Sequence, residues 1–207
     1  MNNLGNKYNY AAAIVNLLIT AFGVLILQWS VQPVIYLFWM EIIIIVIVAC
    51  IRMMGAMDGK PFIQTLPGKI PLLIAALFTG AMIISLAVAF TIGVFANGTD
   101  SESFKGIGIA VAILWCNYLS GLIIQFFLSG HFRVAVPFTE LIFSFVYLLI
   151  LLAFIMAVTQ HLIPALSSRQ SPTLTGLSVI GIKFIIDCLR AYLTPYVTPG
   201  SEESPSP

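Results

Sequence analysis

The sequence predicts an all-α protein, a polytopic membrane protein with about six transmembrane helices in one bundle. Of its 207 residues, 60% are hydrophobic and only 8% are charged, whereas soluble domains carry about 25% charged residues. Apolar runs of about 20 residues, long enough to cross a hydrocarbon core about 30 Å thick, recur along the chain. Clusters of Gly, Pro and small polar residues separate these runs, as expected for loops between helices.

The spans follow from these runs and their boundaries. The segment from Glu41 to Val48 is rich in β-branched residues, but an open strand leaves backbone groups unsatisfied in lipid, so a helix is expected there too. The first run is longer than the apolar core of a cleavable signal peptide, and we expect it to be retained. The six predicted spans are about 10–28, 32–54, 70–95, 106–128, 137–160 and 173–194, in a single domain over 1–194.

The C-terminal tail, residues 195–207, is rich in Pro, Ser and Glu and has little apolar surface to bury. Such a composition predicts disorder. On the side of the membrane that is predicted to be outside, Asn97–Gly98–Thr99 fits an N-glycosylation acceptor, although the same triplet is also typical of a plain turn.

Orientation is predicted from the positive charges that flank the spans. With six spans, one side has six Lys or Arg residues and the other side has only Lys105 and Arg169. Because cytoplasmic loops carry the excess of positive charge, we expect a multi-pass protein of the cell membrane with both termini in the cytoplasm. The six cytoplasmic positions are Lys7, Arg52, Lys60, Lys69, Arg133 and Arg190.

Three charged residues lie deep inside predicted spans: Glu41 in the second, and Lys183 and Asp187 in the sixth. A central charge costs roughly 2.5–3.5 kcal/mol on insertion scales, so such residues are expected to pair. Both helices run in the same direction, and Glu41 and Lys183 lie at matching depths of about 12–14 Å. Asp187 follows Lys183 by one helical turn and shares its face.

These residues suggest a charged cluster between the second and sixth spans, continued at the inner end by Arg52, Glu140 and Arg190. Two interpretations remain open. The charges either line a path for an ion or a solute, or they only hold the helices together and fix their register.

A second polar set lies in the fourth span, where Asn117, Ser120 and Gly121 are spaced at i, i+3 and i+4. Small and polar residues at this spacing are typical of close helix packing with hydrogen bonds between helices, although they could also line a cavity. Asn16 in the first span is interpreted in the same way. Trp29 falls near a predicted boundary between membrane and water, where it is expected to act as an aromatic anchor.

Other classes of function find no support. A net charge of +1 gives no basic patch for nucleic acid. The cysteines (Cys50, Cys116 and Cys188) and the histidines (His131 and His161) show no metal-ligand spacing, so no metal and no cofactor are predicted. No nucleophile elbow, zinc-protease motif, phosphate-binding loop or dinucleotide-binding motif occurs, which argues against an enzyme.

Several segments resemble a family of uncharacterised prokaryotic multi-span membrane proteins. The resemblance rests on Trp29–Ser30, on the segment from Tyr36 to Glu41 with its aromatic-Trp-x-Glu pattern, on Arg52–Met53, and on Lys183 four residues before Asp187. It covers the first 55 residues and the last helix well. The family usually has Asn after the Glu, where this chain has Ile42. The resemblance implies the architecture and groups Glu41 with Lys183 and Asp187, but implies no activity.

The sequence therefore predicts an integral membrane protein of unassigned activity, with two hypotheses. In the first it is a small transporter or channel-like unit with Glu41, Lys183 and Asp187 at its polar centre. In the second it is an assembly subunit whose buried charges only fix helix packing. The expected partner is the lipid bilayer, together with a second copy of the chain or another membrane subunit. The sequence does not specify the substrate.

Overall fold

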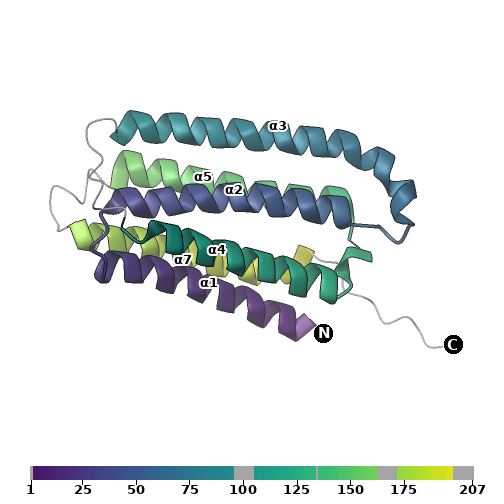
Figure 1. Cartoon of the computed structure of the whole chain (residues 1–207), viewed down its shortest axis with the longest axis horizontal. Helices are drawn as coiled ribbons and strands as arrows, with labels where there is room; N and C mark the ends of the chain where they lie inside the picture. The colour runs from purple at the N-terminus through teal and green to yellow at the C-terminus, as the bar shows by residue number, and fades with distance from the viewer. Residues whose placement is uncertain (1, 96–104, 134, 163–171, 198–207) are drawn as a thin grey trace.

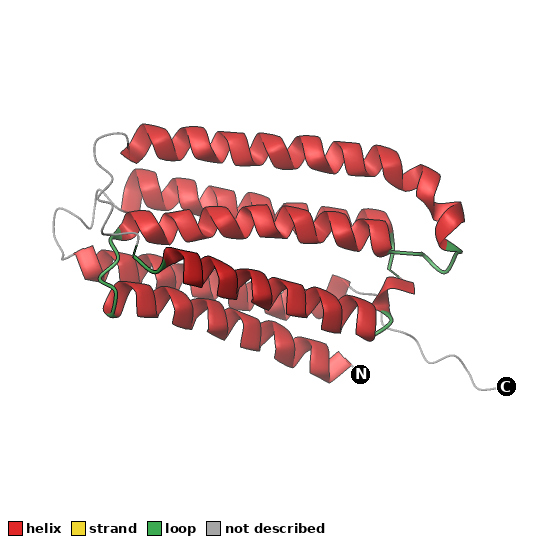
Figure 2. Cartoon of the chain, in the orientation of Figure 1, coloured by secondary structure: helices red, strands yellow, loops and turns green. Residues whose placement is uncertain are grey.

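The computed structural model describes residues 2–95, 105–133, 135–162 and 172–197, and within these ranges the chain forms helices and short turns without strands (Figure 2). The all-helical fold class is thereby confirmed. The elements are α1 (Asn2–Leu25), α2 (Val31–Gly55), α3 (Phe62–Phe95), α4 (Ile107–Gly121) with the π-helix η2 (Leu122–Leu128), the short 3₁₀-helix η3 (His131–Arg133), α5 (Pro137–Ala157) with the π-helix η4 (Val158–Leu162), and α7 (Pro172–Val197).

The long helices lie side by side and alternate in direction, so that α1 begins and α7 ends at the same end of the bundle (Figure 1). We call this end the Lys69 end, because α3 begins there with Lys69 near its start. The opposite end, where α1 ends and α2 begins, is called the Trp29 end. α2 and α7 run in the same direction, from the Trp29 end to the Lys69 end.

The helices divide into two layers. One layer consists of α2, α3 and α5, with α2 packed against both other helices, and the second consists of α1, α4 and α7, with α1 packed against both others (Figure 1). Contacts of α2 with α4 and α7, and of α5 with α7, join the layers. This interface between the layers is called the seam. The largest core cluster follows α2 and α5 and extends across the seam to α7.

Small residues bring α3 close to α2. Ala76 and Gly80 are buried on one face of α3, four residues apart, and a Cβ added at Gly80 would lie 2.7 Å from a methyl group of Val46 on α2. Small residues at this spacing let two transmembrane helices approach closely. Most other large side chains of α3 are exposed, including Phe78, which suits a face turned toward acyl chains.

In the part of the chain that the structure describes, four helical segments are long and apolar enough to cross a membrane: Val31–Gly55, Phe62–Leu86, Ile107–Leu128 and Pro137–Ala157. The apolar part of α1 is shorter, from Tyr10 to Leu25. α7 has 26 residues but includes Lys183, Asp187 and Arg190 and is not among the four.

Several helix boundaries differ from the predicted spans. α1 begins at Asn2 rather than near residue 10. α3 begins at Phe62 and continues through Pro67 and Pro71, whereas the predicted third span begins at residue 70. Each proline removes one backbone hydrogen bond, and Figure 1 shows α3 bending near this end. α7 continues to Val197, so the first three residues of the predicted tail are helical, whereas residues 198–207 lie outside the described residues.

Trp29 is not the interfacial anchor that we expected. Its side chain is only 2% exposed, and its indole N–H donates a hydrogen bond to the backbone oxygen of Lys105 at 2.8 Å. A tryptophan that finds a partner for its N–H can be buried, and this contact joins the start of α2 to the loop before α4.

Candidate functional site

Glu41 and Lys183 lie near the middle of α2 and α7, about 15 Å along each helix from the Trp29 end. The Lys183 ammonium lies 2.8 Å from Oε2 of Glu41 and 3.0 Å from its Oε1. On its own helix, Lys183 also contacts Oδ2 of Asp187 at 2.5 Å. A single ammonium is thus shared by two carboxylates on different helices.

Two tyrosines complete the hydrogen bonds of these carboxylates. The Tyr118 hydroxyl on α4 donates to Oε1 of Glu41 at 2.5 Å, and the Tyr147 hydroxyl on α5 donates to Oδ1 of Asp187 at 2.7 Å. Each carboxylate therefore receives hydrogen bonds from an ammonium and from a phenol. Hydrogen bonds to an ionised group are stronger than neutral ones, and here they take the place that water would have on an exposed carboxylate.

Arg190 brings the second positive charge, one turn of α7 beyond Asp187. Its guanidinium carbon lies 4.0 Å from the centre of the Tyr147 ring, and its Nη1 donates to the Tyr118 oxygen at 3.4 Å. Guanidinium groups stack favourably on aromatic faces. With two carboxylates, one ammonium and one guanidinium, the formal charges cancel. We call these six residues the charge cluster: Glu41, Tyr118, Tyr147, Lys183, Asp187 and Arg190.

The cluster extends across the seam. Glu41 and Tyr147 belong to the layer of α2, α3 and α5, and the other four residues belong to the layer of α1, α4 and α7. The bonds of Glu41 to Lys183 and to Tyr118 therefore join the layers, as does that of Tyr147 to Asp187. The Lys183–Asp187 pair, in contrast, lies within α7 and needs no second helix.

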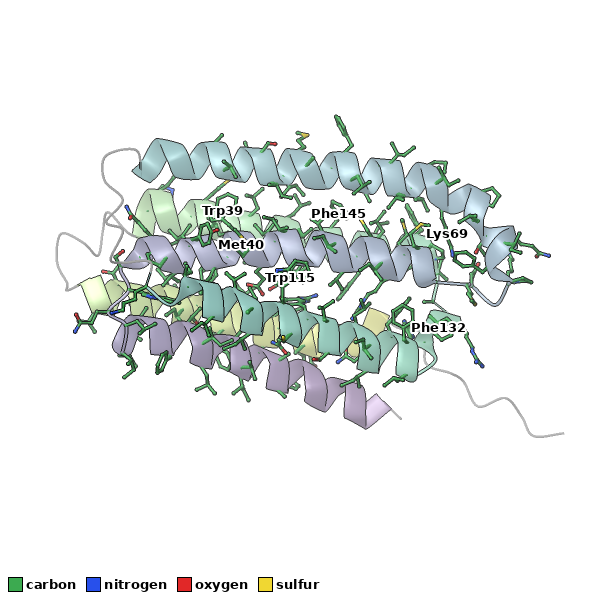
Figure 3. The ribbon with its side chains drawn as sticks, in the orientation of Figure 1. Trp39, Met40, Lys69, Trp115, Phe132 and Phe145 are labelled. Atoms are coloured by element: carbon green, nitrogen blue, oxygen red, sulfur yellow. The ribbon has the colours of Figure 1, made fainter. Side chains whose placement is uncertain are left out.

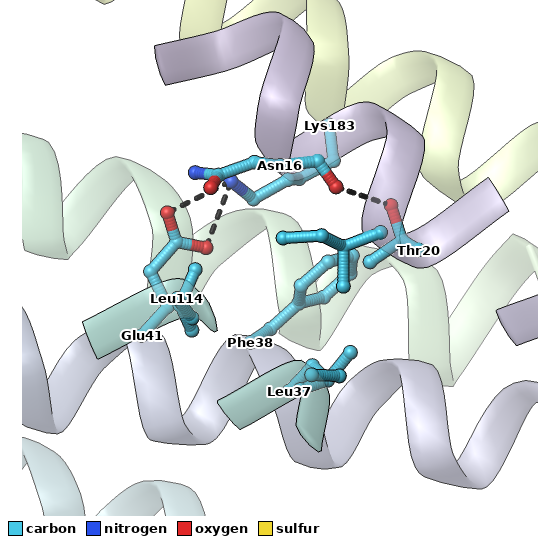
Figure 4. A pocket seen from close by; sticks show the side chains of 9 residues that line it. Asn16, Thr20, Leu37, Phe38, Glu41, Leu114 and Lys183 are labelled. Carbon is cyan, nitrogen blue, oxygen red and sulfur yellow. Dashed lines mark hydrogen bonds and ion pairs between the residues drawn. The ribbon is translucent and has the colours of Figure 1, made fainter. Parts of the chain in front are cut away.

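A small pocket adjoins the cluster on the side of the Trp29 end (Figure 4). It has room for about one water molecule and is partly open to the surface of the bundle. Carbon atoms form nearly all of its wall, and the Phe38 ring centre lies 5.7 Å from the Lys183 ammonium. Like the cluster, the pocket lies at the seam. Its lining residues are Asn16, Ile19, Thr20, Leu37, Phe38, Glu41, Ala110, Leu114 and Lys183.

Of the three residues predicted for the inner end of the cluster, Arg190 belongs to the charge cluster, whereas the places given there to Arg52 and Glu140 remain predictions. The guanidinium carbon of Arg52, at the end of α2, lies 5.9 Å from the ring centre of Phe126 in η2. The side chain of Glu140 is not among those described, so its pairing with Arg52 or Arg190 remains a prediction. Arg190 contacts Tyr118 and Tyr147.

In the second polar set, Asn117 connects two helices whereas Ser120 does not. Asn117 Nδ2 donates to Oδ1 of Asn16 at 2.8 Å and to the backbone oxygen of Ala12 at 3.2 Å, which joins α4 to α1. The Ser120 hydroxyl donates to the Cys116 oxygen within its own helix. Asn16 also lines the pocket, so this hydrogen bond holds part of the pocket wall in place.

Lys69, counted in the sequence as a loop residue, is a buried side chain of α3 near the bend (Figure 3). Its ammonium donates to the backbone oxygen of Met54 at 2.8 Å and lies 4.7 Å from the ring centre of Phe62. It satisfies a carbonyl in the last turn of α2, where positive charge also suits the helix dipole.

Sequence reasoning did not include Tyr118 in the principal cluster and missed Tyr147 altogether. A signal was available for Tyr147, which lies in the middle of an apolar run rather than at its edge. A buried phenol usually needs a hydrogen-bond partner. The nature of that partner, Asp187, could be seen only once α5 and α7 were placed side by side.

Comparison with known proteins gives one match. A sequence model for a protein family matches residues 2–201, nearly the whole chain. The chain belongs to a family of unknown function, DUF6498. This confirms the expectation of a family without an assigned activity, and membership in DUF6498 itself names no site and no substrate. No curated protein and no solved structure matches the chain. Among the described side chains, no group of three His, Cys, Asp or Glu residues could hold a metal ion.

Proposed function

We propose that this protein is a small transporter or channel-like unit of the cell membrane, with its substrate path at the seam. One observation carries the proposal: the charge cluster and the pocket both lie between the same two layers. Relative motion of the layers would open the pocket and break the bonds of Glu41 to Lys183 and Tyr118. Binding sites near the bilayer midplane, at the interface between two bundles, are typical of transporters.

The free-energy cost of burying the charge cluster supports a functional role. Buried ion pairs can often be replaced by well-packed apolar residues with no loss of stability, or with a gain of about 1–4 kcal/mol. Packing alone therefore gives little reason for four charged side chains near the membrane centre. Ionisable residues within the membrane commonly mark ion or solute pathways.

The proposal includes six spans, with α1 and α7 added to the four long apolar segments. The charged residues of α7 that enter the cluster face the interior of the bundle, so they do not prevent α7 from spanning. We place the Lys69 end in the cytoplasm because most Lys and Arg residues of the chain lie toward it. Both termini are then cytoplasmic.

A second candidate function is an assembly subunit of a membrane complex. It is favoured by the fact that Glu41, Asp187 and Lys183 all have charged partners within the chain. Such a cluster fixes the register of α2 against α7 without any transport. The chain would then bind a second copy or another membrane subunit through its exposed apolar faces.

Access of water to the pocket separates the two candidates. We would replace Cys50, Cys116 and Cys188 by Ala and introduce Thr20→Cys in the pocket wall. In lipid vesicles, a charged thiosulfonate reagent that does not cross membranes should modify this cysteine, because opening of the seam exposes it to water and allows the reactive thiolate to form.

Leu18→Cys is the matched control, two residues away on α1 and 61% exposed on the outside of the bundle. It should remain unmodified because acyl chains cover it. Modification of Thr20→Cys alone supports a water-accessible path. If neither cysteine reacts, the seam stays sealed and the assembly subunit is the correct function.

A further inference from the structure

We infer that Glu41 is a proton-binding site, which takes up a proton when the seam opens and Lys183 stays with Asp187. The role of this site in transport rests on the proposed function. The geometry of the site, however, can be tested without knowing the substrate.

The first step of the argument is the unequal attachment of Lys183. Its ammonium bonds Asp187 within α7 and Glu41 across the seam. When the layers separate, the pair within α7 is retained, because residues four apart remain neighbours on a helix. Glu41 is then a carboxylate near the membrane centre without its ammonium.

Among the described side chains around Glu41, its own layer offers no second ammonium or guanidinium. From α7 it faces Lys183, with Asp187 and Arg190 behind, from α4 it faces Tyr118, and α5 contributes Tyr147. The residues of α1 in the pocket wall, Asn16, Ile19 and Thr20, are not titratable. An unpaired charge in such a place is neutralised by a change in protonation rather than tolerated.

The occupant is a proton rather than a metal cation. Hard cations need several oxygen ligands around them, whereas the pocket beside Glu41 is walled mainly by carbon atoms of Leu37, Phe38, Ala110 and Leu114. A proton needs only the carboxylate. A hydronium ion in the water that enters the opened pocket delivers the proton to a Glu41 oxygen and becomes a water molecule, while Lys183 and Asp187 remain charged. One positive charge is thereby added to the cluster.

Infrared difference spectroscopy of the full chain in lipid vesicles tests this inference. Lowering the pH should produce C=O stretching bands of protonated carboxyl groups, and one of these bands belongs to Glu41. This band should disappear in Glu41→Gln and move in Glu41→Asp. It should be retained in Asp187→Glu, in which Lys183 keeps a carboxylate four residues away. Lys60→Gln, a charge change in an exposed turn, should leave the band unchanged.

Asp187→Asn tests the retention of Lys183 directly. Without Asp187, the ammonium keeps Glu41 as its carboxylate partner and stays with it, so the Glu41 band should appear only at a lower pH than in the wild type. Survival of every band in Glu41→Gln, a Glu41 band that moves in Asp187→Glu, or the absence of such a band from the wild type would overturn the inference. A Glu41 band together with an unreactive Thr20→Cys would refute the transport path but not the proton site.

Discussion

At the scale of single residues, the two tyrosines do what water does for carboxylates in soluble proteins. Tyr118 and Tyr147 each donate to one oxygen of a buried carboxylate. Removing one partner from a buried ionised group leaves the other unsatisfied, which costs about 1–3 kcal/mol or more. The phenols are therefore part of the site rather than of its packing.

Tyr147→Phe should lower the free energy of unfolding by about 1–3 kcal/mol, because Asp187 loses a hydrogen bond while the ring remains. Tyr118→Phe should cost more, since its oxygen also accepts from Arg190. Unfolding in mixed micelles, followed by tryptophan fluorescence, measures both. Tyr10→Phe on α1, for which no side-chain hydrogen bond is described, is the control and should change stability by less than about 0.5 kcal/mol. Equal effects of all three substitutions would contradict the role given to the phenols.

Much of the cluster could be inferred from individual residues and their depth. Glu41 and Lys183 stand out because charge is rare in apolar helices, and matched depth on parallel helices suggests their contact. The same reasoning placed Arg190 with Glu140, which stays a prediction, but it did not anticipate the contact of Arg190 with the Tyr147 ring. An aromatic ring has no charge and follows no periodic pattern in the sequence that would identify it as the partner of a guanidinium. The contact can be recognised only when α5 and α7 are known to be adjacent.

At the scale of helices, the turn between α1 and α2 shows how a glycine and a tryptophan depend on each other. A Cβ at Gly23 would lie 2.1 Å from the Trp29 ring. In addition, the backbone N–H of Trp29 donates to the backbone oxygen of Gly23 at 3.0 Å. The ring cannot move away without losing its bond to Lys105. α1 is thereby held against the start of α2.

Gly23→Ala should therefore lower stability by about 1–3 kcal/mol, the usual cost of overpacking. Gly181→Ala on α7 is the matched control, because no heavy atom lies within 4 Å of the added Cβ. Alanine there should be neutral or stabilise the helix by up to about 1 kcal/mol. Thermal unfolding in detergent measures both, and similar melting temperatures for the two variants would contradict the tight contact.

The presence of the helices was predictable because the length of the apolar runs and the polar breaks between them are local properties of the sequence. The start of α3 was not, since Pro67 and Gly68 are normally read as loop residues. The helix continues through this region, and Lys69 is buried there against Met54 and Phe62. Such a tertiary contact leaves no periodic signal.

At the scale of the whole molecule, the bundle is two layers joined by a polar cluster. Which helices form each layer does not follow chain order, since α1 packs with α4 and α7 while α2 packs with α3 and α5. Hydropathy gives the number and direction of helices but not their neighbours. The seam, and with it the position of the pocket, could therefore not be predicted from the sequence.

The distance between the layers tests the account most directly. Spin labels at the exposed positions Leu86 on α3 and Leu25 on α1 report on separation at the Trp29 end, and Leu25 with Leu174 on α7 forms the control pair within one layer. Measured in lipid by pulsed electron resonance, the first pair should show two distances whose ratio changes with pH, and Glu41→Gln should favour the longer one. The control pair should keep one distance throughout. A single distance between Leu86 and Leu25, unchanged by pH and by Glu41→Gln, would contradict a seam that opens.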